Sequence, residues 1–159
     1  MKQHPNYDPE AVRPMWEGLV AAGFEYLTEE AQVHEALSNP KGTTLLIINS
    51  VCGCAAGNAR PGAISSLWHD KIPDRLITVF AGMDHEAVAR ARSFLYGVAP
   101  SSPCIAVFKD GEAHTVLERR HLEQMTEKEI TRLLTQIYDA ICTRPGPAIP
   151  VAESEQANR

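Results

Sequence analysis

The fold of this chain is decided at residues 43–61, which read Thr43-Thr44-Leu45-Leu46-Ile47-Ile48-Asn49-Ser50-Val51-Cys52-Gly53-Cys54-Ala55-Ala56-Gly57-Asn58-Ala59-Arg60-Pro61. The short apolar run at 43–48 is rich in leucine and β-branched residues, and it predicts a buried strand of a parallel or mixed sheet. Small, helix-tolerant residues follow Cys54, so we expect a helix to begin there and to kink at Pro61. Two thiols therefore lie where a central strand meets the start of a helix.

This position favours reactive cysteines. Backbone N–H groups point outward at a helix N-terminus and favour an anion, and the thiolate is the reactive form of cysteine. Only Gly53 separates Cys52 from Cys54, so a disulfide between them is expected to be strained and easily reduced. The spacing predicts a redox site, with buried thiols or half of a metal site as the alternatives. Zinc needs about four ligands, and the other candidate side chains are scattered along the chain: His69, His85, His114 and His121.

Length and composition limit the class of protein. The 159 residues are enough for one domain, and 44% apolar and 22% charged residues are ordinary values for a globular chain. A net charge of −5 argues against nucleic acid and anionic membranes as partners. No stretch has the apolar length of a membrane span, and residues 1–8 lack the apolar core of a signal peptide. We therefore expect a cytoplasmic protein, in which four cysteines indicate catalysis, metal binding or buried thiols rather than structural disulfides.

The residues before the central strand predict two helices. Residues 1–7 are expected to form a loose arm. Asp8-Pro9-Glu10 is typical of a helix start, but Pro14 conflicts with one long helix. The first helix is therefore expected to be regular only from near Arg13, with Pro14 in its first turn, and to end at Gly23. Residues 24–27 predict a short strand or linker, and Thr28 is expected to cap a second helix.

The residues after the cysteine pair predict strands at 74–80, 104–108 and 113–117, with a helix capped by Asp84 after the first of them. Asp110-Gly111 predicts a tight hairpin, and Thr126 with Glu129 forms a capping box for the last helix. The order of elements predicts an α/β fold in which helices cover both faces of a mixed sheet. Residues 1–143 are expected to form one domain, and the Pro-rich, polar residues 144–159 a disordered tail.

Four further positions are candidates for the site or for its surroundings. Arg60 could stabilise a thiolate or bind a carboxylate of a thiol ligand, and Asn58 could cap the helix or hydrogen-bond a ligand. Cys104 is expected in the core, with a role as a third redox thiol left open, and Cys142 is expected to pack at the end of the last helix.

With these residues assembled, the chain resembles the bacilliredoxin family. The first motif, residues 49–57 with Ala59-Arg60-Pro61, is highly specific. The likeness runs from about residue 10 to 142, and its other matches are Ala22-Gly23-Phe24-Glu25, Thr78-Val79-Phe80-Ala81-Gly82, Ala99-Pro100-Ser101-Ser102-Pro103 and Arg120-His121.

The resemblance implies a thioredoxin-like fold with an extra N-terminal helix. It also implies reduction of mixed disulfides between protein cysteines and bacillithiol, a low-molecular-weight thiol co-substrate, with no cofactor and no metal. Cys52 would attack and Cys54 would resolve. The Ser102–Pro103 bond is expected to be cis beside Cys52, with the Ser102 backbone pairing to substrate. Cys104 stands where the family pattern has serine.

Two other functions stay open at this point. Weak disulfide isomerase activity is attributed to the same family, so the chain could act chiefly as a protein disulfide isomerase or general disulfide reductase. A module that binds a metal or an iron–sulfur cluster through Cys52, Cys54 and Cys104 is the alternative from a different class, because soft thiolates suit zinc and iron clusters.

Overall fold

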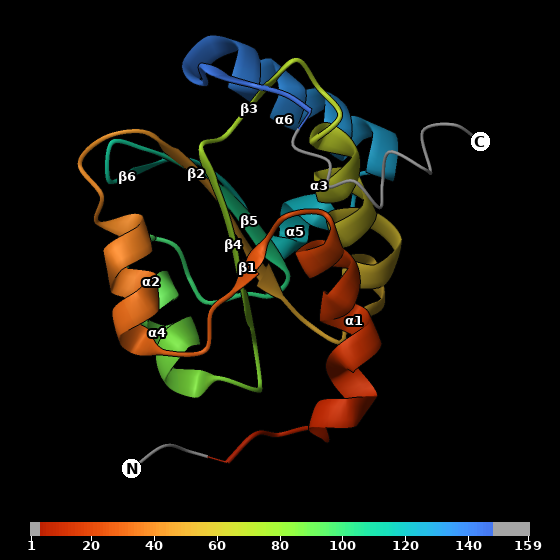
Figure 1. Cartoon of the computed structure of the whole chain (residues 1–159). Coiled ribbons are helices and arrows are strands. Elements are labelled where there is room, and N and C mark those ends of the chain that lie inside the picture. The colour runs from red at the N-terminus through yellow and green to blue at the C-terminus, as the bar shows by residue number, and fades with distance from the viewer. Residues whose placement is uncertain (1–3, 148–159) are drawn as a thin grey trace.

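The structure is a computed structural model that describes residues 4–147 (Figure 1). One mixed five-stranded sheet, in the order β1-β4-β2-β5-β6, forms its centre, and β3 and β7 form a small second sheet. The elements along the chain are α1 (Pro9–Ala21), β1 (Glu25–Tyr26), α2 (Glu30–Leu37), β2 (Thr43–Asn49), the π-helix η1 (Ala55–Ala59), α3 (Arg60–Ser66), β3 (Lys71–Ile72), β4 (Arg75–Phe80), α4 (His85–Ser93), β5 (Cys104–Lys109), β6 (Glu112–Leu117), α5 (Arg119–Leu122), α6 (Glu127–Ile141) and β7 (Arg144–Pro145).

The predicted central strand is β2, and all seven of its residues are buried. It pairs in parallel with β4 on one side and antiparallel with β5 on the other. The β5–β6 hairpin turns at Asp110 and Gly111, which have φ values of 53° and 86°. Positive φ at both positions is what a two-residue hairpin of the predicted kind needs. The mixed sheet and its hairpin are therefore confirmed.

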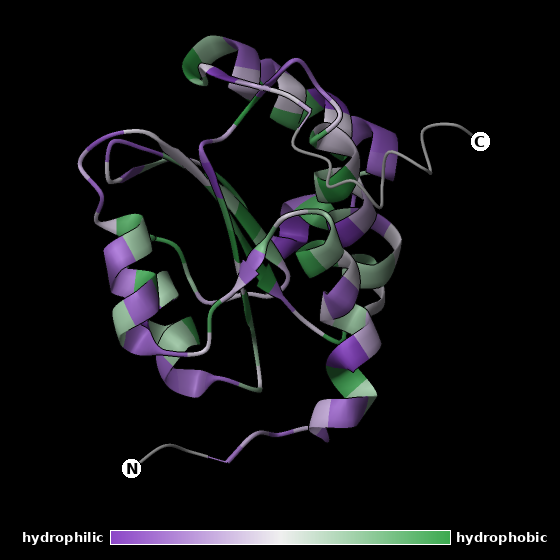
Figure 2. Ribbon diagram, in the orientation of Figure 1, coloured by the Kyte–Doolittle hydropathy of each residue, from purple (hydrophilic) through white to green (hydrophobic). Residues whose placement is uncertain are grey.

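Helices cover both faces of the sheet, as predicted (Figure 1). Alternate side chains of β2 point to opposite faces. Leu45 and Ile47 belong to a core cluster with residues of α1, α3 and α6, whereas Leu46 and Ile48 belong to a second cluster with residues of α2 and α4. Figure 2 shows the apolar colour concentrated on the central strands between these two layers. Packing on both faces of the sheet thus holds β2 in place, and this fixes the position of the loop that follows Asn49.

Two helices start at different residues from those predicted. The first helix begins at Pro9, not near Arg13, because the Asp8 side chain accepts the N–H of Glu10 and Pro9 itself opens the helix. Pro14 lies inside it. The second helix is capped at Glu29 rather than Thr28, since the Gln32 side chain reaches back to accept the Glu29 N–H.

The helix after Cys54 is not a single kinked α-helix. Its first five residues form η1, in which the N–H of Arg60 donates to the carbonyl of Ala55, five residues back. Pro61 has no N–H to donate to a carbonyl four residues back, and the wider π turn ahead of it accommodates this loss before α3 begins. The π turn lies directly after the cysteine pair.

Residues near both ends of the described range are more structured than predicted. Residues 144–145, assigned to the tail, form β7 and pair with β3. The remainder of the predicted tail, residues 148–159, lies outside the described residues. The predicted loose arm is docked where it is described, because the N–H of Asn6 donates to the carbonyl of Gly82 at 2.7 Å. These contacts pair backbone N–H and C=O groups in hydrogen bonds that the sequence pattern does not predict.

Candidate active site

The loop that carries the cysteines is held by Asn49, the last residue of β2. Its buried side chain accepts the N–H of Ser50 and an N–H of Arg60, both at 2.9 Å, and donates to the carbonyl of Met15 at 2.9 Å. Arg60 donates a second bond to the Ser50 carbonyl at 3.2 Å. The amide thus joins the loop to α1 and α3, and it fixes the backbone just before Cys52.

Arg60 and Asn58 therefore act on the loop and on α5 in this structure. The Arg60 guanidinium is half-buried against Asn49 and the loop backbone, and the Asn58 amide donates to the carbonyl of Leu122 at 3.1 Å. Neither side chain lines the pocket beside Cys52. Their predicted roles toward a ligand stay predictions.

The two thiols are in contact and both are reduced. The Sγ atoms of Cys52 and Cys54 lie 2.9 Å apart, and the backbone N–H of Cys54 donates to the Cys52 sulfur at 3.3 Å. Ser50 accepts the N–H of Cys52 at 3.2 Å, which orients the start of the turn. Both thiols are partly exposed. The Cys54 thiol is therefore within reach of the Cys52 thiol without any rearrangement of the backbone.

The surroundings separate the pKa values of the two thiols. Burial raises the pKa of Cys52, but hydrogen bonds from the Cys54 thiol and from the N–H groups of Cys54 and Ala55, with the charge of Arg119, outweigh it and lower that pKa. Burial and the hydrogen bond to Cys52 raise the pKa of Cys54 to about 11. Near neutral pH, Cys52 is thus the thiol that ionises more readily, and Cys54 is the proton-bearing donor beside it.

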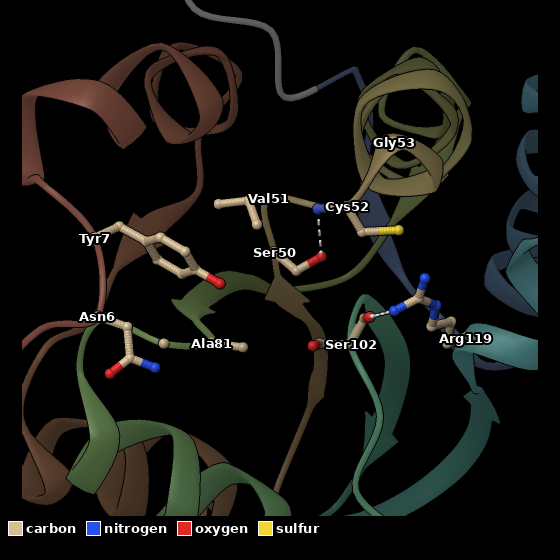
Figure 3. Close-up of a pocket in the computed structure, with 10 residues that line it drawn as sticks. Asn6, Tyr7, Ser50, Val51, Cys52, Gly53, Ala81, Ser102 and Arg119 are labelled. Atoms are coloured by element: carbon tan, nitrogen blue, oxygen red, sulfur yellow. Dashed lines mark hydrogen bonds between the residues drawn. The ribbon is translucent and has the colours of Figure 1, made fainter.

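A pocket of about 500 Å³ opens beside Cys52. Figure 3 shows the Cys52 sulfur on one side of it, next to the Arg119 guanidinium, with Tyr7 across from them. Segments that are distant in the sequence meet here, and the lining residues are Asn6, Tyr7, Ser50, Val51, Cys52, Gly53, Ala81, Gly82, Ser102 and Arg119.

The Ser102–Pro103 bond is cis, as predicted, and Ser102 lines the pocket with Cys52. Two arginines hold this turn. Arg92 donates to the carbonyl of Ser101 at 2.8 Å, and Arg119 lies 3.5 Å from the carbonyl of Ser102 (Figure 3). The turn is thereby fixed next to the reactive sulfur.

Arg119 is a site residue that the sequence did not reveal, as is Tyr7. Arg119 is the first residue of α5, a four-residue helix that follows the β5–β6 hairpin. The sequence did not predict this helix, and Arg119 is 67 positions from Cys52. Its backbone N–H also donates to the Ser101 side chain at 3.2 Å. The only signal in the sequence was its place beside Arg120-His121, one of the motifs that carried the family resemblance.

Cys104 and Cys142 are buried, as predicted. Cys104 opens β5 directly after Pro103, and burial raises its pKa to about 11. Burial also raises the pKa of Cys142, at the end of α6. Neither thiol lines the pocket, so the redox role left open for Cys104 stays a prediction.

Among the described residues, 4–147, no three His, Cys, Asp or Glu side chains come together as a group that could hold a metal ion. In the same residues, no helix has both the length and the apolar character needed to cross a membrane.

The sequence matches known proteins over most of its length. Residues 7–142 match a family described as disulphide isomerase. A bacilliredoxin of Cytophaga hutchinsonii is 47% identical over 135 residues, which cover 85% of this chain and 99% of that relative. A bacilliredoxin of Halalkalibacterium halodurans is 42% identical over 139 residues, which cover 87% of this chain and 96% of the relative.

Solved thioredoxin structures are more distant neighbours. Thioredoxin O2 of Arabidopsis thaliana is 16% identical, with a TM-score of 0.48 over 74% of this chain and 96% of that one. Thioredoxin of Plasmodium falciparum is 14% identical, with a TM-score of 0.49 over 73% of this chain and 99% of that one. The family match and the curated relatives, together with the mixed sheet and the paired thiols, lead to one conclusion. The chain belongs to the bacilliredoxin family and is a thiol–disulfide oxidoreductase.

Proposed function

We propose that this protein removes bacillithiol from S-bacillithiolated protein cysteines through Cys52 and Cys54. The observation that carries the proposal is the pairing of an activated thiol with a protonated one at the edge of a pocket. Cys52 has a lowered pKa, lines the pocket and lies 2.9 Å from Cys54. The names of the relatives supply the choice of bacillithiol as the thiol. The proposed compartment is the cytoplasm, where free cysteines stay reduced.

In the first step, the Cys52 thiolate attacks the bacillithiol sulfur of the mixed disulfide. A bond forms between Cys52 and bacillithiol as the bond between bacillithiol and the substrate protein breaks. The substrate cysteine leaves as a thiolate with the electron pair of that bond, and it takes up a proton from water. Attack requires the thiolate, and the hydrogen bonds from Cys54 and the backbone favour it at neutral pH.

In the second step, Cys52 is released by one of two thiols. Cys54 can lose its proton and attack the Cys52 sulfur, which forms a Cys52–Cys54 disulfide and releases bacillithiol with that proton. Two external thiols then reduce this disulfide in two exchange steps, and they leave as the disulfide that they form with each other. Alternatively, a second bacillithiol attacks the bacillithiol sulfur held on Cys52, forms oxidised bacillithiol and restores the Cys52 thiolate.

The attacked disulfide must lie in line with the Cys52 sulfur, so its backbone must be held. We assign this to the Ser102–Pro103 turn, which borders the pocket and is itself fixed by Arg92 and Arg119. In this proposal Arg60 and Asn58 act indirectly, since they position the loop and α5 instead of contacting the ligand.

The test is removal of bacillithiol from a modified protein by the wild type, Cys52→Ala, Cys54→Ala and the buried-thiol control Cys142→Ala. We expect Cys52→Ala to abolish removal. Cys54→Ala should keep it when bacillithiol is supplied as the second thiol, and Cys142→Ala should keep the wild-type rate. Activity that persists in Cys52→Ala would refute the proposal.

A second candidate is disulfide isomerisation, favoured by the description of the matching family. An isomerase attacks a disulfide between two protein cysteines and must release its substrate without trapping it. The two functions are compared by assaying one preparation of the protein in two reactions. One is the recovery of activity by a substrate protein with scrambled disulfides, and the other is the removal of bacillithiol. Faster recovery of the scrambled protein than removal of bacillithiol would make isomerisation the main activity.

A further inference from the structure

The pocket beside Cys52 has a wall that comes from the N-terminal segment. Asn6 and Tyr7 line it, although they are more than 40 positions from the cysteines. The segment is fixed by the bond from the Asn6 N–H to the Gly82 carbonyl at 2.7 Å, and by a contact of 3.1 Å between the His85 ring and the carbonyl of His4. It is therefore a built part of the pocket.

The Tyr7 ring lies against the backbone of Gly82. A Cβ atom added to Gly82 would come within 2.6 Å of Cε2 of Tyr7, so the ring occupies space that any other residue would fill. Gly82 also has a φ of 90°, which favours glycine. In Figure 3 the Tyr7 hydroxyl points into the pocket, toward the side where Ser50 and Ser102 lie. The ring is 41% exposed, so one part packs on the protein and another faces the pocket.

The opposite wall carries a positive charge. Arg119 lies there beside the Cys52 sulfur (Figure 3), with a contact of 3.5 Å to Glu123 at its outer side. Hydrogen-bonding groups from Asn6, Tyr7, Ser50 and Arg119 thus surround one volume next to the reactive sulfur. A volume of about 500 Å³ is within the range of small-molecule sites.

We propose that this pocket holds the low-molecular-weight thiol half of the mixed disulfide, with Tyr7 as its specificity-determining wall and Arg119 as the contact for its carboxylate. The inference rests on the proposed function and names which half of the substrate the pocket recognises. An aromatic ring with a hydroxyl suits a polar, compact thiol, and a guanidinium suits a carboxylate.

A protein segment is the other possible occupant, and the geometry favours the small thiol. The lining comes from five separate parts of the chain, and the side chains of Asn6, Tyr7, Ser50, Ser102 and Arg119 can hydrogen-bond. In the proposed reaction, the protein half of the mixed disulfide pairs with the Ser102 backbone at the border of the pocket. The volume between Tyr7 and Arg119 then remains for the thiol half (Figure 3).

The experiment compares two reactions across matched variants. The site variants are Tyr7→Ala, Tyr7→Phe and Arg119→Gln. The controls are Tyr96→Ala, which removes a tyrosine that is 88% exposed and lies outside the pocket, and Arg120→Gln, which removes the neighbouring arginine. Each is assayed for kcat and KM in removal of bacillithiol from a modified protein, and for reduction of insulin disulfides, which contain no small thiol. Arg119→Gln is compared at a pH at which Cys52 is fully ionised in both proteins.

We expect Tyr7→Ala to raise KM for the bacillithiolated protein about tenfold, and Arg119→Gln to raise it at least as much, since a hydrogen bond to a charged group is the stronger kind. Tyr7→Phe should raise KM less than Tyr7→Ala does, and the difference between them separates the contribution of the hydroxyl from that of the ring. Insulin reduction by the two Tyr7 variants should stay near the wild type, and so should both reactions in the two control variants.

Three results would overturn the inference. An unchanged KM in Tyr7→Ala and Arg119→Gln would show that the pocket does not recognise the small thiol. An equal loss in insulin reduction would show that it holds a protein segment. A wild type that does not remove bacillithiol at all would reject the proposed function, and this inference with it, whereas the first two results leave that function standing.

Discussion

Cys52 receives hydrogen bonds from a neighbouring thiol and from the backbone, and each favours its ionised form. The Cys54 thiol lies 2.9 Å away, and the Cys54 N–H donates at 3.3 Å. The pKa of Cys52 is lowered, whereas that of Cys54 is raised to about 11. Because the same contact acts in opposite directions on the two thiols, one loses its proton at a lower pH than an ordinary thiol and the other keeps it until strongly alkaline pH.

This difference predicts which thiol reacts with iodoacetamide. The rate should rise with pH as Cys52 ionises, level off below the titration range of an ordinary thiol, and rise again only as Cys54 ionises near pH 11. Cys54→Ala removes the donor to Cys52, so the pKa of Cys52 should rise and its alkylation at pH 7 should slow by roughly tenfold.

Mass spectrometry of the alkylated peptides, with Cys104→Ala as the control, measures this prediction. The control changes a buried thiol that the reagent does not reach at neutral pH, so its profile should match the wild type. Equal alkylation of Cys52 and Cys54 at pH 7, or no change in Cys54→Ala, would contradict the assignment of roles.

At the scale of elements, α3 is placed by its contact with α6. Gly62 of α3 lies so close to Ile130 that an added Cβ would be 2.8 Å from the Cβ of Ile130. The Thr131 hydroxyl also donates to the Gly62 carbonyl at 3.0 Å. This close approach fixes α3, and through η1 it fixes the residues that follow Cys54.

We therefore expect Gly62→Ala to lower the free energy of unfolding by about 1–3 kcal/mol, because the extra methyl group overpacks the contact between α3 and α6. Gly18→Ala is the matched control. Gly18 lies in α1 with nothing within 4 Å of an added Cβ, so the higher helix propensity of alanine should raise stability by up to about 1 kcal/mol. Urea unfolding of both variants measures the difference, and equal stability of the two would show that α3 and α6 are not in close contact.

Elements with strong local signals could be predicted from the sequence. The apolar run at 43–49, the Asp110-Gly111 turn and the capping box at Thr126 each place their element correctly, because the interactions that define them lie within a few residues. The π turn η1 could not be predicted, because it depends on how the chain accommodates Pro61. The strand β7 could not be predicted either, because it depends on pairing with β3, more than 70 residues earlier.

At the scale of the whole molecule, the fold brings together residues that no spacing in the sequence relates. The cysteine pair was predicted, because a strand followed by two thiols and small residues is a local pattern that indicates a redox site. Tyr7 and Arg119 were not, because they reach the pocket only through the docking of the N-terminal segment on Gly82 and through the position of α5 after the hairpin. The Arg60 side chain holds the loop that carries the thiols, and its predicted role toward a ligand stays a prediction.

The central claim is that Cys52 takes bacillithiol from a modified protein. The most direct measurement uses Cys54→Ser, which cannot form the Cys52–Cys54 disulfide and so retains the first intermediate. After reaction with an S-bacillithiolated protein and no added bacillithiol, peptide mass spectrometry should find bacillithiol on Cys52, in an amount equal to that lost by the substrate. Bacillithiol found on Cys104 or Cys142 instead, or substrate that stays modified while Cys52 stays free, would contradict the account.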